Sequence, residues 1–253
     1  MSTQQHSSTA SEWFATPLGQ YALAREQEYF DRAVADVFGY NALQLGMVEH
    51  DLLGASRIPL RLRIDISGAV QIRADFRDLP IASNSADLVL LPHVLEFSEH
   101  PHQILREVAR VLLPEAHVVI ACFNPWSLWG FRRIFNSGAH YPWRGRFINL
   151  PRLKDWLALL GFEIVAGQMG CYAPPCTQQK WLDRFRFMEK AGDRWWPMAG
   201  GVYYLQAVKR VRGMRLIMPK WSDRFAPKKN LAAVPKKVSK PQEPVTARET
   251  VKQ

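Results

Sequence analysis

The sequence has only three cysteines, no long apolar run and no basic segment followed by an apolar stretch at its start. Cys122, Cys171 and Cys176 form no C-x-x-C pair, which argues against a disulfide framework and against a zinc site. No other cluster has metal-ligand spacing. Because no run of about 18 apolar residues exists, we expect no membrane-spanning helix. Because the polar start has no basic region followed by an apolar core, we expect no secretion signal. These absences favour a protein of the reducing cytoplasm.

The chain of 253 residues carries a formal net charge of +10, and most of the information lies in where that charge is placed. Residues 209–253 contain 13 Lys and Arg against 3 Asp and Glu, whereas the preceding 208 residues contain 20 of each. We therefore expect a neutral domain over residues 12–210. The Ser/Thr/Gln-rich start (1–11) and the Pro/Lys-rich end (211–253) are predicted to be disordered.

The basic tail is suited to RNA phosphates or to an anionic membrane surface, through contacts that depend on salt. Lysine-rich disordered tails are also common in proteins with no dedicated partner for them. The sequence leaves these alternatives open.

The first part of the domain shows helical and then strand-like patterns. Apolar residues at helical spacing predict one long helix or two short ones over residues 17–38, with Gly39 as the residue that ends it. Residues 41–46 suit a short strand and residues 47–55 a short helix. Residues 60–75 alternate apolar and polar side chains on both sides of a Ser-Gly pair, which predicts a β-hairpin.

Residues 74–125 are the most informative stretch. They contain an acidic strand end, a Leu-Pro turn, a continuous apolar strand, a helix beginning at Pro101 and a second apolar strand. This order resembles the second half of a class I S-adenosylmethionine-dependent methyltransferase. Within the small-molecule group, the chain is most similar to a poorly characterised bacterial branch with a degenerate glycine loop. The resemblance implies an α/β fold: a Rossmann-like sheet with helices on both faces and an antiparallel last strand.

The family's glycine-rich loop is not intact. The resemblance implies an acidic residue and a G-x-G-x-G loop after the first strand, but the sequence reads NALQLGMVEHD. Gly46 matches the first glycine, Gln44 replaces the acidic residue, and residues 47–50 replace the rest. We expect the side chains at Val48 and His50 to narrow the space for the methionine half of the cofactor, S-adenosylmethionine.

The resemblance implies that two further acidic residues bind the cofactor. Asp65 lies 19 residues after Gly46, close to the ~20 typical of nucleotide-binding units, and would bind the ribose hydroxyls. On a hairpin it would instead face solvent, and the helix that usually follows this strand is missing. Asp75 would accept a hydrogen bond from the adenine amino group and Phe76 would donate its amide, unless Asp75 only caps a turn.

Residues after the next two strands would border the reacting methyl group. His93 could serve as a general base or simply pack at a strand end, and Asn124 could contact substrate or form a turn. The aromatic and basic segment 126–147, together with 170–200, is predicted to cap a small-molecule substrate. For 126–147, stacking on bases, lying on anionic lipid and plain packing of a subdomain remain alternatives.

Two classes of function follow. The first is a methyltransferase of unknown substrate, and the second is a catalytically silent relative that binds or regulates. Gln44, the lost glycines and the missing helix motivate the second. An RNA-associated protein that uses the tail for affinity is a third hypothesis.

Overall fold

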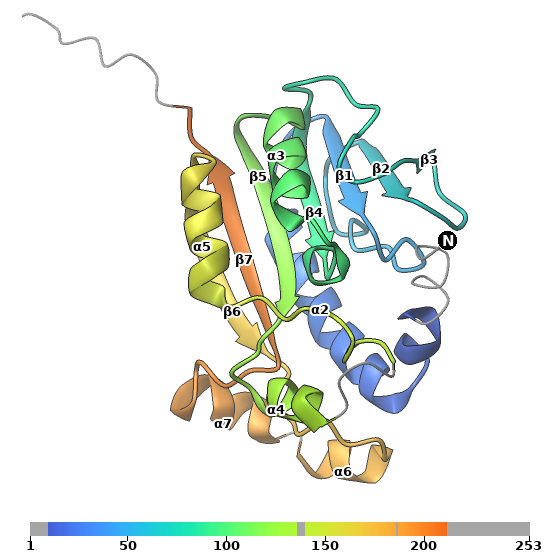
Figure 1. Cartoon of the computed structure of the whole chain (residues 1–253), viewed down its shortest axis with the longest axis vertical. Helices are drawn as coiled ribbons and strands as arrows, with labels where there is room; N and C mark the ends of the chain where they lie inside the picture. The colour runs from blue at the N-terminus through green and yellow to red at the C-terminus, as the bar shows by residue number, and fades with distance from the viewer. Residues whose placement is uncertain (1–9, 136–139, 186, 212–253) are drawn as a thin grey trace, which may run out of the picture. The chain divides into compact units, whose positions relative to one another are not determined.

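The computed structural model describes residues 10–135, 140–185 and 187–211, which lie within one compact unit. A seven-stranded sheet runs through this unit in the order β3-β2-β1-β4-β5-β7-β6 (Figure 1). Neighbouring strands are parallel except at β7, which is antiparallel to both β5 and β6. The predicted α/β sheet with an antiparallel last strand is confirmed. The strands are β1 Asn41–Leu45, β2 Leu60–Asp65, β3 Ile72–Arg73, β4 Ala86–Pro92, β5 Leu112–Phe123, β6 Phe162–Gly170 and β7 Val202–Lys209.

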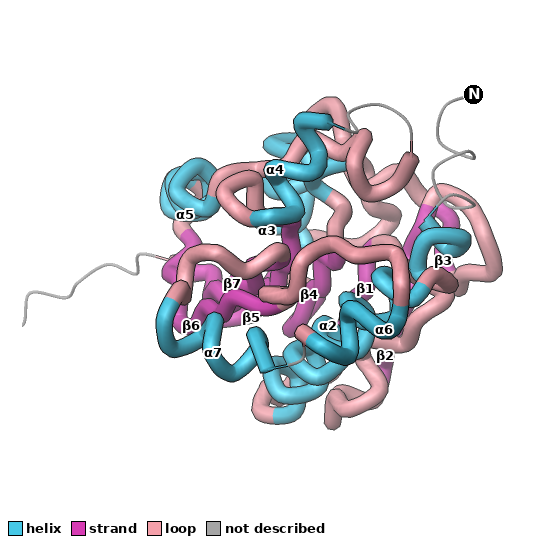
Figure 2. The backbone as a smooth tube through the Cα atoms, turned by 90° about the horizontal axis from the view of Figure 1, so that it is seen from below, coloured by secondary structure: helices cyan, strands magenta, loops and turns pink. Residues whose placement is uncertain are grey.

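Helices cover both faces of the sheet, with α3 and α5 on one face and α2 on the other (Figure 2). The central strands explain this arrangement. On β4, Val89 and Leu91 pack toward α3 and α5, whereas Leu88 and Leu90 pack toward α2. Successive side chains of a strand point to opposite faces, so a strand covered on both sides must be apolar throughout. The helices are α2 Pro17–Ala35, the 3₁₀ turn η1 Leu95–Phe97, α3 Pro101–Val111, α4 Leu128–Phe135, α5 Leu150–Leu159, α6 Gln179–Arg184 and α7 Phe187–Trp195.

The hairpin predicted for residues 60–75 is wrong. β2 and β3 are parallel, with Ile64 paired to Ile72. Residues 66–71 connect them, where Gly68 adopts a φ of +93° that suits glycine. Strands near a sheet edge are partly exposed in either direction, so alternation alone did not distinguish the two arrangements. The crossover helix of the family is absent here, as the sequence predicted.

Two local predictions before β2 also need correction. Residues 47–55 form separate turns instead of a helix, and Leu52 and Leu53 from these turns cover the sheet face. The helix α2 ends with Asp36 as its C-cap, so Gly39 does not end it. A Cβ at Gly39 would lie 2.3 Å from Cβ of Asp87, and close approach is therefore the reason for glycine there.

The segments predicted to form a cap follow the carboxyl ends of the strands. The helix α4 follows β5, and α6 and α7 lie between β6 and β7. The predictions for the two termini fall almost wholly outside the described residues. Ala10, Ser11 and Val211 are the exceptions. Ala10 and Ser11 belong to a helical segment, 10–14, where disorder was expected. Within the described part of the chain, no helix is long and apolar enough to cross a membrane.

Candidate functional site

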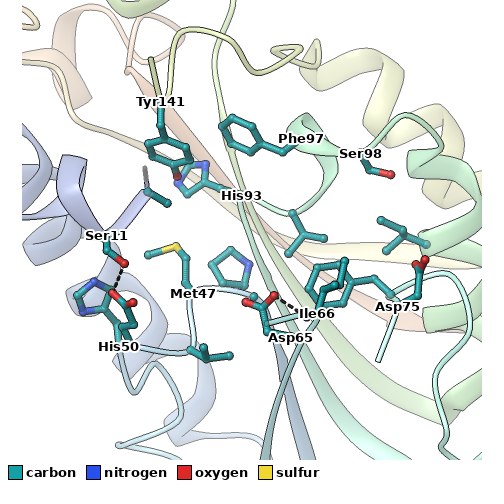
Figure 3. A pocket seen from close by; sticks show the side chains of 18 of the residues that line it. Ser11, Met47, His50, Asp65, Ile66, Asp75, His93, Phe97, Ser98 and Tyr141 are labelled. Atoms are coloured by element: carbon teal, nitrogen blue, oxygen red, sulfur yellow. Dashed lines mark hydrogen bonds between the residues drawn. The ribbon is translucent and has the colours of Figure 1, made fainter. Parts of the chain in front are cut away.

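A cavity of about 350 Å³ lies at the carboxyl ends of β1, β2 and β4. Figure 3 shows Met47 and Asp65 along one side of it and Phe97 and Tyr141 along the other. Ligands of open α/β sheets bind at this edge of the sheet. The volume is at the lower end of the range of about 300–1,000 Å³ for small-molecule pockets.

The loop after β1 is held by the buried side chain of Gln44. Its Nε2 atom lies 3.2, 3.0 and 2.8 Å from the carbonyl oxygens of Gly46, Met47 and His50. Its Oε1 atom accepts a hydrogen bond of 3.1 Å from the amide of Leu52. A carboxylate has no hydrogen to donate to these carbonyl groups. The conformation of this loop therefore requires a hydrogen-bond donor at position 44. This requirement explains why glutamine stands where the family has an acidic residue.

Gly46 and Met47 turn the chain away from β1 with consecutive left-handed conformations, at φ of 78° and 47°. A Cβ at Gly46 would lie 3.0 Å from Cγ2 of Val94, so both the conformation and the close approach require glycine. Side chains of residues 47–50 line the cavity where the family has glycines, but they do not fill it.

Asp65 is the last residue of β2, and it lines the cavity. Its Oδ1 atom accepts a hydrogen bond of 2.6 Å from the amide of Ile66. Partial burial raises the pKa of the carboxyl group, although that hydrogen bond opposes the shift. Because β2 is parallel to its neighbours, its carboxyl end brings Asp65 to the cavity, and the alternative of a purely solvent-facing hairpin residue is removed.

Asp75 lines the cavity and also organises a turn. Arg77 holds its carboxylate with three side-chain contacts, Nε to Oδ1 at 3.0 Å, Nε to Oδ2 at 3.1 Å and Nη2 to Oδ2 at 2.6 Å. It also donates its backbone amide to Oδ1 at 2.9 Å. These hydrogen bonds hold the pKa of Asp75 below its usual value. Phe76 also lines the cavity. A ligand that needs the Asp75 carboxylate must therefore share it with Arg77.

His93 is buried between two carboxylates. Its Nε2 atom lies 2.8 Å from Oε1 of Glu26, and its Nδ1 atom lies 3.2 Å from Oε1 of Glu96. Burial opposes protonation, but the two carboxylates outweigh it and raise the pKa of His93 to about 10. An imidazolium that donates from both nitrogens has no lone pair for a substrate proton. This geometry favours the packed alternative over the general base.

The same cluster contains two buried oxygens without a partner among the described residues, Oε2 of Glu26 and Oε2 of Glu96. The other oxygen of Glu96 also accepts a hydrogen bond of 2.6 Å from the amide of Phe123. The ring of Phe123 stacks on His93 with centroids 4.0 Å apart. The cluster thus joins α2, β4 and β5 at the wall of the cavity, which His93 also lines.

Asn124 does not line the cavity. Its Nδ2 atom donates to the carbonyl oxygens of Met198 and Gly200, each at 2.9 Å, and its Oδ1 atom accepts from the amide of Trp126 at 3.0 Å. The side chain therefore fastens the end of β5 to the segment before β7. Of its two predicted roles, the structure favours the turn.

The sequence interpretation missed the contributions of Glu26, Tyr141 and the segment 10–14. Glu26 had a recognisable signal, because it occurs four residues after Ala22 and four before Phe30 on the apolar face of α2. A charged residue in such a stripe indicates a buried partner. Tyr141 and the short segment 10–14, which line the cavity, had no comparable signal.

A second cavity, of about 370 Å³, lies between the segment before α2 and the segment after β5. Trp13, Leu18, Arg132 and Trp143 line it, and Tyr141 lines both cavities. The guanidinium of Arg132 stands 5.4 Å from the ring centroid of Trp143. No acidic side chain is among the residues that line this cavity, so it suits a flat or apolar molecule, with a positive charge at one wall.

Comparisons with known proteins agree with this geometry. Residues 27–120 match the methyltransferase domain family. The uncharacterized protein YafS of Escherichia coli is 31% identical over 156 residues, or 60% of this chain and 65% of that protein. The biotin biosynthesis bifunctional protein BioHC of Cellvibrio japonicus is 26% identical over 92 residues, or 36% of this chain and 18% of that protein. The matches thus span less than two thirds of each relative's length.

Solved structures support the fold. A methyltransferase of Thermotoga maritima, described as a possible histamine N-methyltransferase, superposes with a TM-score of 0.58 at 14% identity. The superposition covers 79% of this chain and 94% of that one. This likeness and the strand order show that the chain has the fold of S-adenosylmethionine-dependent methyltransferases, and residues 27–120 match the methyltransferase domain family.

Proposed function

We propose that the chain is an active methyltransferase that binds S-adenosylmethionine in the first cavity and a small-molecule acceptor in the second. One observation carries the proposal. The cavity at the carboxyl edge remains open although the glycine loop is lost, and it is bounded by Gly46, Asp65 and Asp75. These three residues match the family's cofactor-binding positions after the first three strands.

The residues that line the first cavity fit the cofactor. The carboxylate of Asp65 can accept hydrogen bonds from both ribose hydroxyls, and Asp75 can accept one from the adenine amino group beside Arg77. The amide of Phe76 can donate to the adenine ring, and Gly46 allows the backbone to approach closely. When bound, the cofactor supplies a methyl group already activated by its sulfonium charge. The protein therefore needs to position the acceptor and exclude water.

The acceptor would occupy the second cavity and reach the first beside Tyr141, which lines both, because methyl transfer requires the acceptor atom to contact the methyl group. Tyr141 is held by stacking on Phe97, at a centroid distance of 4.7 Å, and by an edge contact with Trp13 at 5.4 Å. His93 stays protonated and fixes α2 against the sheet behind this region.

The three cysteines are unpaired, and we propose that the protein acts in the cytoplasm.

Calorimetric titration with S-adenosylmethionine and S-adenosylhomocysteine tests the cofactor part of the proposal. Micromolar binding of both is expected. A folded protein that shows no heat of binding up to millimolar ligand would instead support the catalytically silent relative. Trp143→Ala is the matched variant for the second cavity. It should leave cofactor affinity unchanged, because Trp143 lines only the second cavity.

A further inference from the structure

Large apolar side chains are exposed in a concentrated group on the segments that follow β5 and β6. Of the sixteen large apolar residues that are exposed in the described part of the chain, ten lie within residues 126–135 and 181–198. We call this group the aromatic edge. It consists of Trp126, Leu128, Phe131, Ile134, Phe135, Trp181, Phe187, Trp195, Trp196 and Met198. Figure 1 shows that α4, α6 and α7, which carry most of it, lie at the same end of the sheet, and Figure 2 shows α4 on one side of the sheet layer and α6 and α7 on the other.

The helix α4 turns its apolar side outward. Phe131 and Phe135 are 59% and 73% exposed, and with Leu128 they recur at spacings of three and four residues, so they share one face of the helix. A surface helix of a water-soluble domain normally shows the reverse pattern. An outward apolar stripe on a helix indicates contact with an apolar environment.

The two arginines of α4 face protein partners. Arg132 donates to the carbonyl oxygen of Pro175, and its guanidinium lies over the ring of Trp143. Arg133 donates to the carbonyl oxygen of Gly145 at 2.7 Å, and its guanidinium lies 5.3 Å from the ring centroid of Phe147. The charges of α4 are thus held against the domain, which leaves the outer surface of the helix to Phe131, Ile134 and Phe135.

The segments that carry the aromatic edge are also basic. Residues 126–149 contain four Arg and no Asp or Glu, and residues 174–198 contain five Lys and Arg against three Asp and Glu. Because residues 1–208 are neutral as a whole, the rest of the domain is acidic and the positive charge is concentrated at this end. Arg146, Lys180, Arg184 and Arg194 are exposed among these segments.

We propose that the aromatic edge docks on an anionic membrane surface. Exposed Trp and Phe beside Arg and Lys are the combination that enters the headgroup region of a bilayer. The aliphatic members Leu128, Ile134 and Met198 favour lipid over RNA, since they offer no ring for a base to stack on. The second cavity is lined in part by Arg132 of α4 and by Thr177, which closely precedes α6. Docking of these helices would therefore bring the second cavity close to the lipid.

The test is co-sedimentation of the full chain with vesicles of phosphatidylcholine and phosphatidylglycerol in equal amounts, and with pure phosphatidylcholine vesicles. Binding to the anionic vesicles is expected, with a substantial part retained in about 1 M salt, where the Debye length is about 3 Å. The double variants Phe131→Ser/Phe135→Ser and Trp195→Ser/Trp196→Ser should each weaken binding about tenfold, because they remove the apolar contact.

The matched control is Phe38→Ser/Leu159→Ser. These residues are 72% and 85% exposed but precede β1 and β6, at the opposite edge of the sheet, so binding should not change. The proposal is overturned if no variant weakens vesicle binding and salt abolishes it, which would assign binding to the basic tail. It is also overturned if the wild type does not sediment with vesicles. In that case, binding of a single-stranded oligonucleotide would identify RNA as the occupant of the aromatic edge. A dimer in light scattering that the Phe131→Ser/Phe135→Ser substitutions dissociate would identify a second copy of the chain.

Discussion

Nε2 of His93, one residue beyond β4, lies 2.8 Å from Oε1 of Glu26 in the middle of α2, and both side chains are completely buried. The two residues are 67 positions apart in the chain. Their ion pair fixes the N-terminal helix against the carboxyl edge of the sheet, where the first cavity opens. A buried charge that loses its partner is costly, so this contact is expected to contribute strongly to stability.

Glu26→Gln should lower the free energy of unfolding by about 3 kcal/mol, because the imidazolium of His93 keeps only one carboxylate. Denaturant titration measures the change. Glu28→Gln on the same helix is the control, since Glu28 forms an exposed pair with Arg25, and it should cost less than about 1 kcal/mol. Equal effects of the two substitutions would contradict a special role for the buried pair.

The same pair predicts how stability depends on pH. The pKa of His93 is raised from 6.5 to about 10 on folding, so the folded protein holds a proton that the unfolded chain releases. The stabilisation is complete below pH 6.5 and is lost as the pH rises toward about 10. Denaturant titrations across this range should show the wild type losing more stability than Glu26→Gln. Parallel curves would show that Glu26 does not hold the proton.

Gln44→Glu should destabilise the protein, although it restores the residue type of the family. The buried carboxylate would face the carbonyl oxygens of Gly46, Met47 and His50 with no hydrogen to donate, at a cost of about 3 kcal/mol. Thermal or denaturant unfolding measures the loss. Gln103→Glu, on the exposed side of α3, is the control and should change stability by less than about 0.5 kcal/mol. A more stable Gln44→Glu protein would contradict the assigned hydrogen bonds.

Asp75 and Arg77 should have opposite effects on cofactor binding. Asp75→Ala removes the acceptor for the adenine amino group and should weaken S-adenosylmethionine binding about tenfold, whereas Arg77→Ala frees the carboxylate and should leave the affinity equal or higher. Calorimetry on both variants compares them. If Arg77→Ala weakens binding as much as Asp75→Ala, the pair acts by holding the turn, and Asp75 does not bind the cofactor directly.

The sequence predicted the sheet and its helices well where apolar periodicity reports burial. The apolar runs at residues 88–91 and 118–123 predicted strands covered on both faces, which β4 and β5 contain, and α3 showed a clear helical stripe. The direction of the strands at the edge of the sheet could not be predicted in this way. The alternation around Ser67 and Gly68 fits a hairpin and a tight parallel connection equally well, because period two reports exposure and not direction.

For the candidate site, the sequence predicted the residues at the carboxyl ends of strands but not the side-chain contacts around them. Gly46, Asp65 and Asp75 follow strands, so the topology brings them to one edge and the structure shows them lining one cavity. The roles suggested for His93 and Asn124 depended on contacts with Glu26 and with the segment before β7. Those partners lie 67 and more than 70 residues away in the chain. The local sequence pattern around His93 and Asn124 does not predict contacts with residues so distant in the chain.

Asp65 offers a direct test of the cofactor site, because its carboxylate accepts hydrogen bonds from the backbone amides of Ile66 and Ser67 and, within the described part of the chain, is not paired with an arginine as Asp75 is. Asp65→Asn removes the charge from an acceptor of the ribose hydroxyls and should weaken S-adenosylmethionine binding by about tenfold to a hundredfold, the equivalent of a charged hydrogen bond. Asp155→Asn, exposed on α5, is the control. If the affinity of Asp65→Asn is unchanged and circular dichroism shows an intact fold, the ribose does not bind at the end of β2. Asp75 and Phe76 would then remain as the candidate cofactor-binding residues.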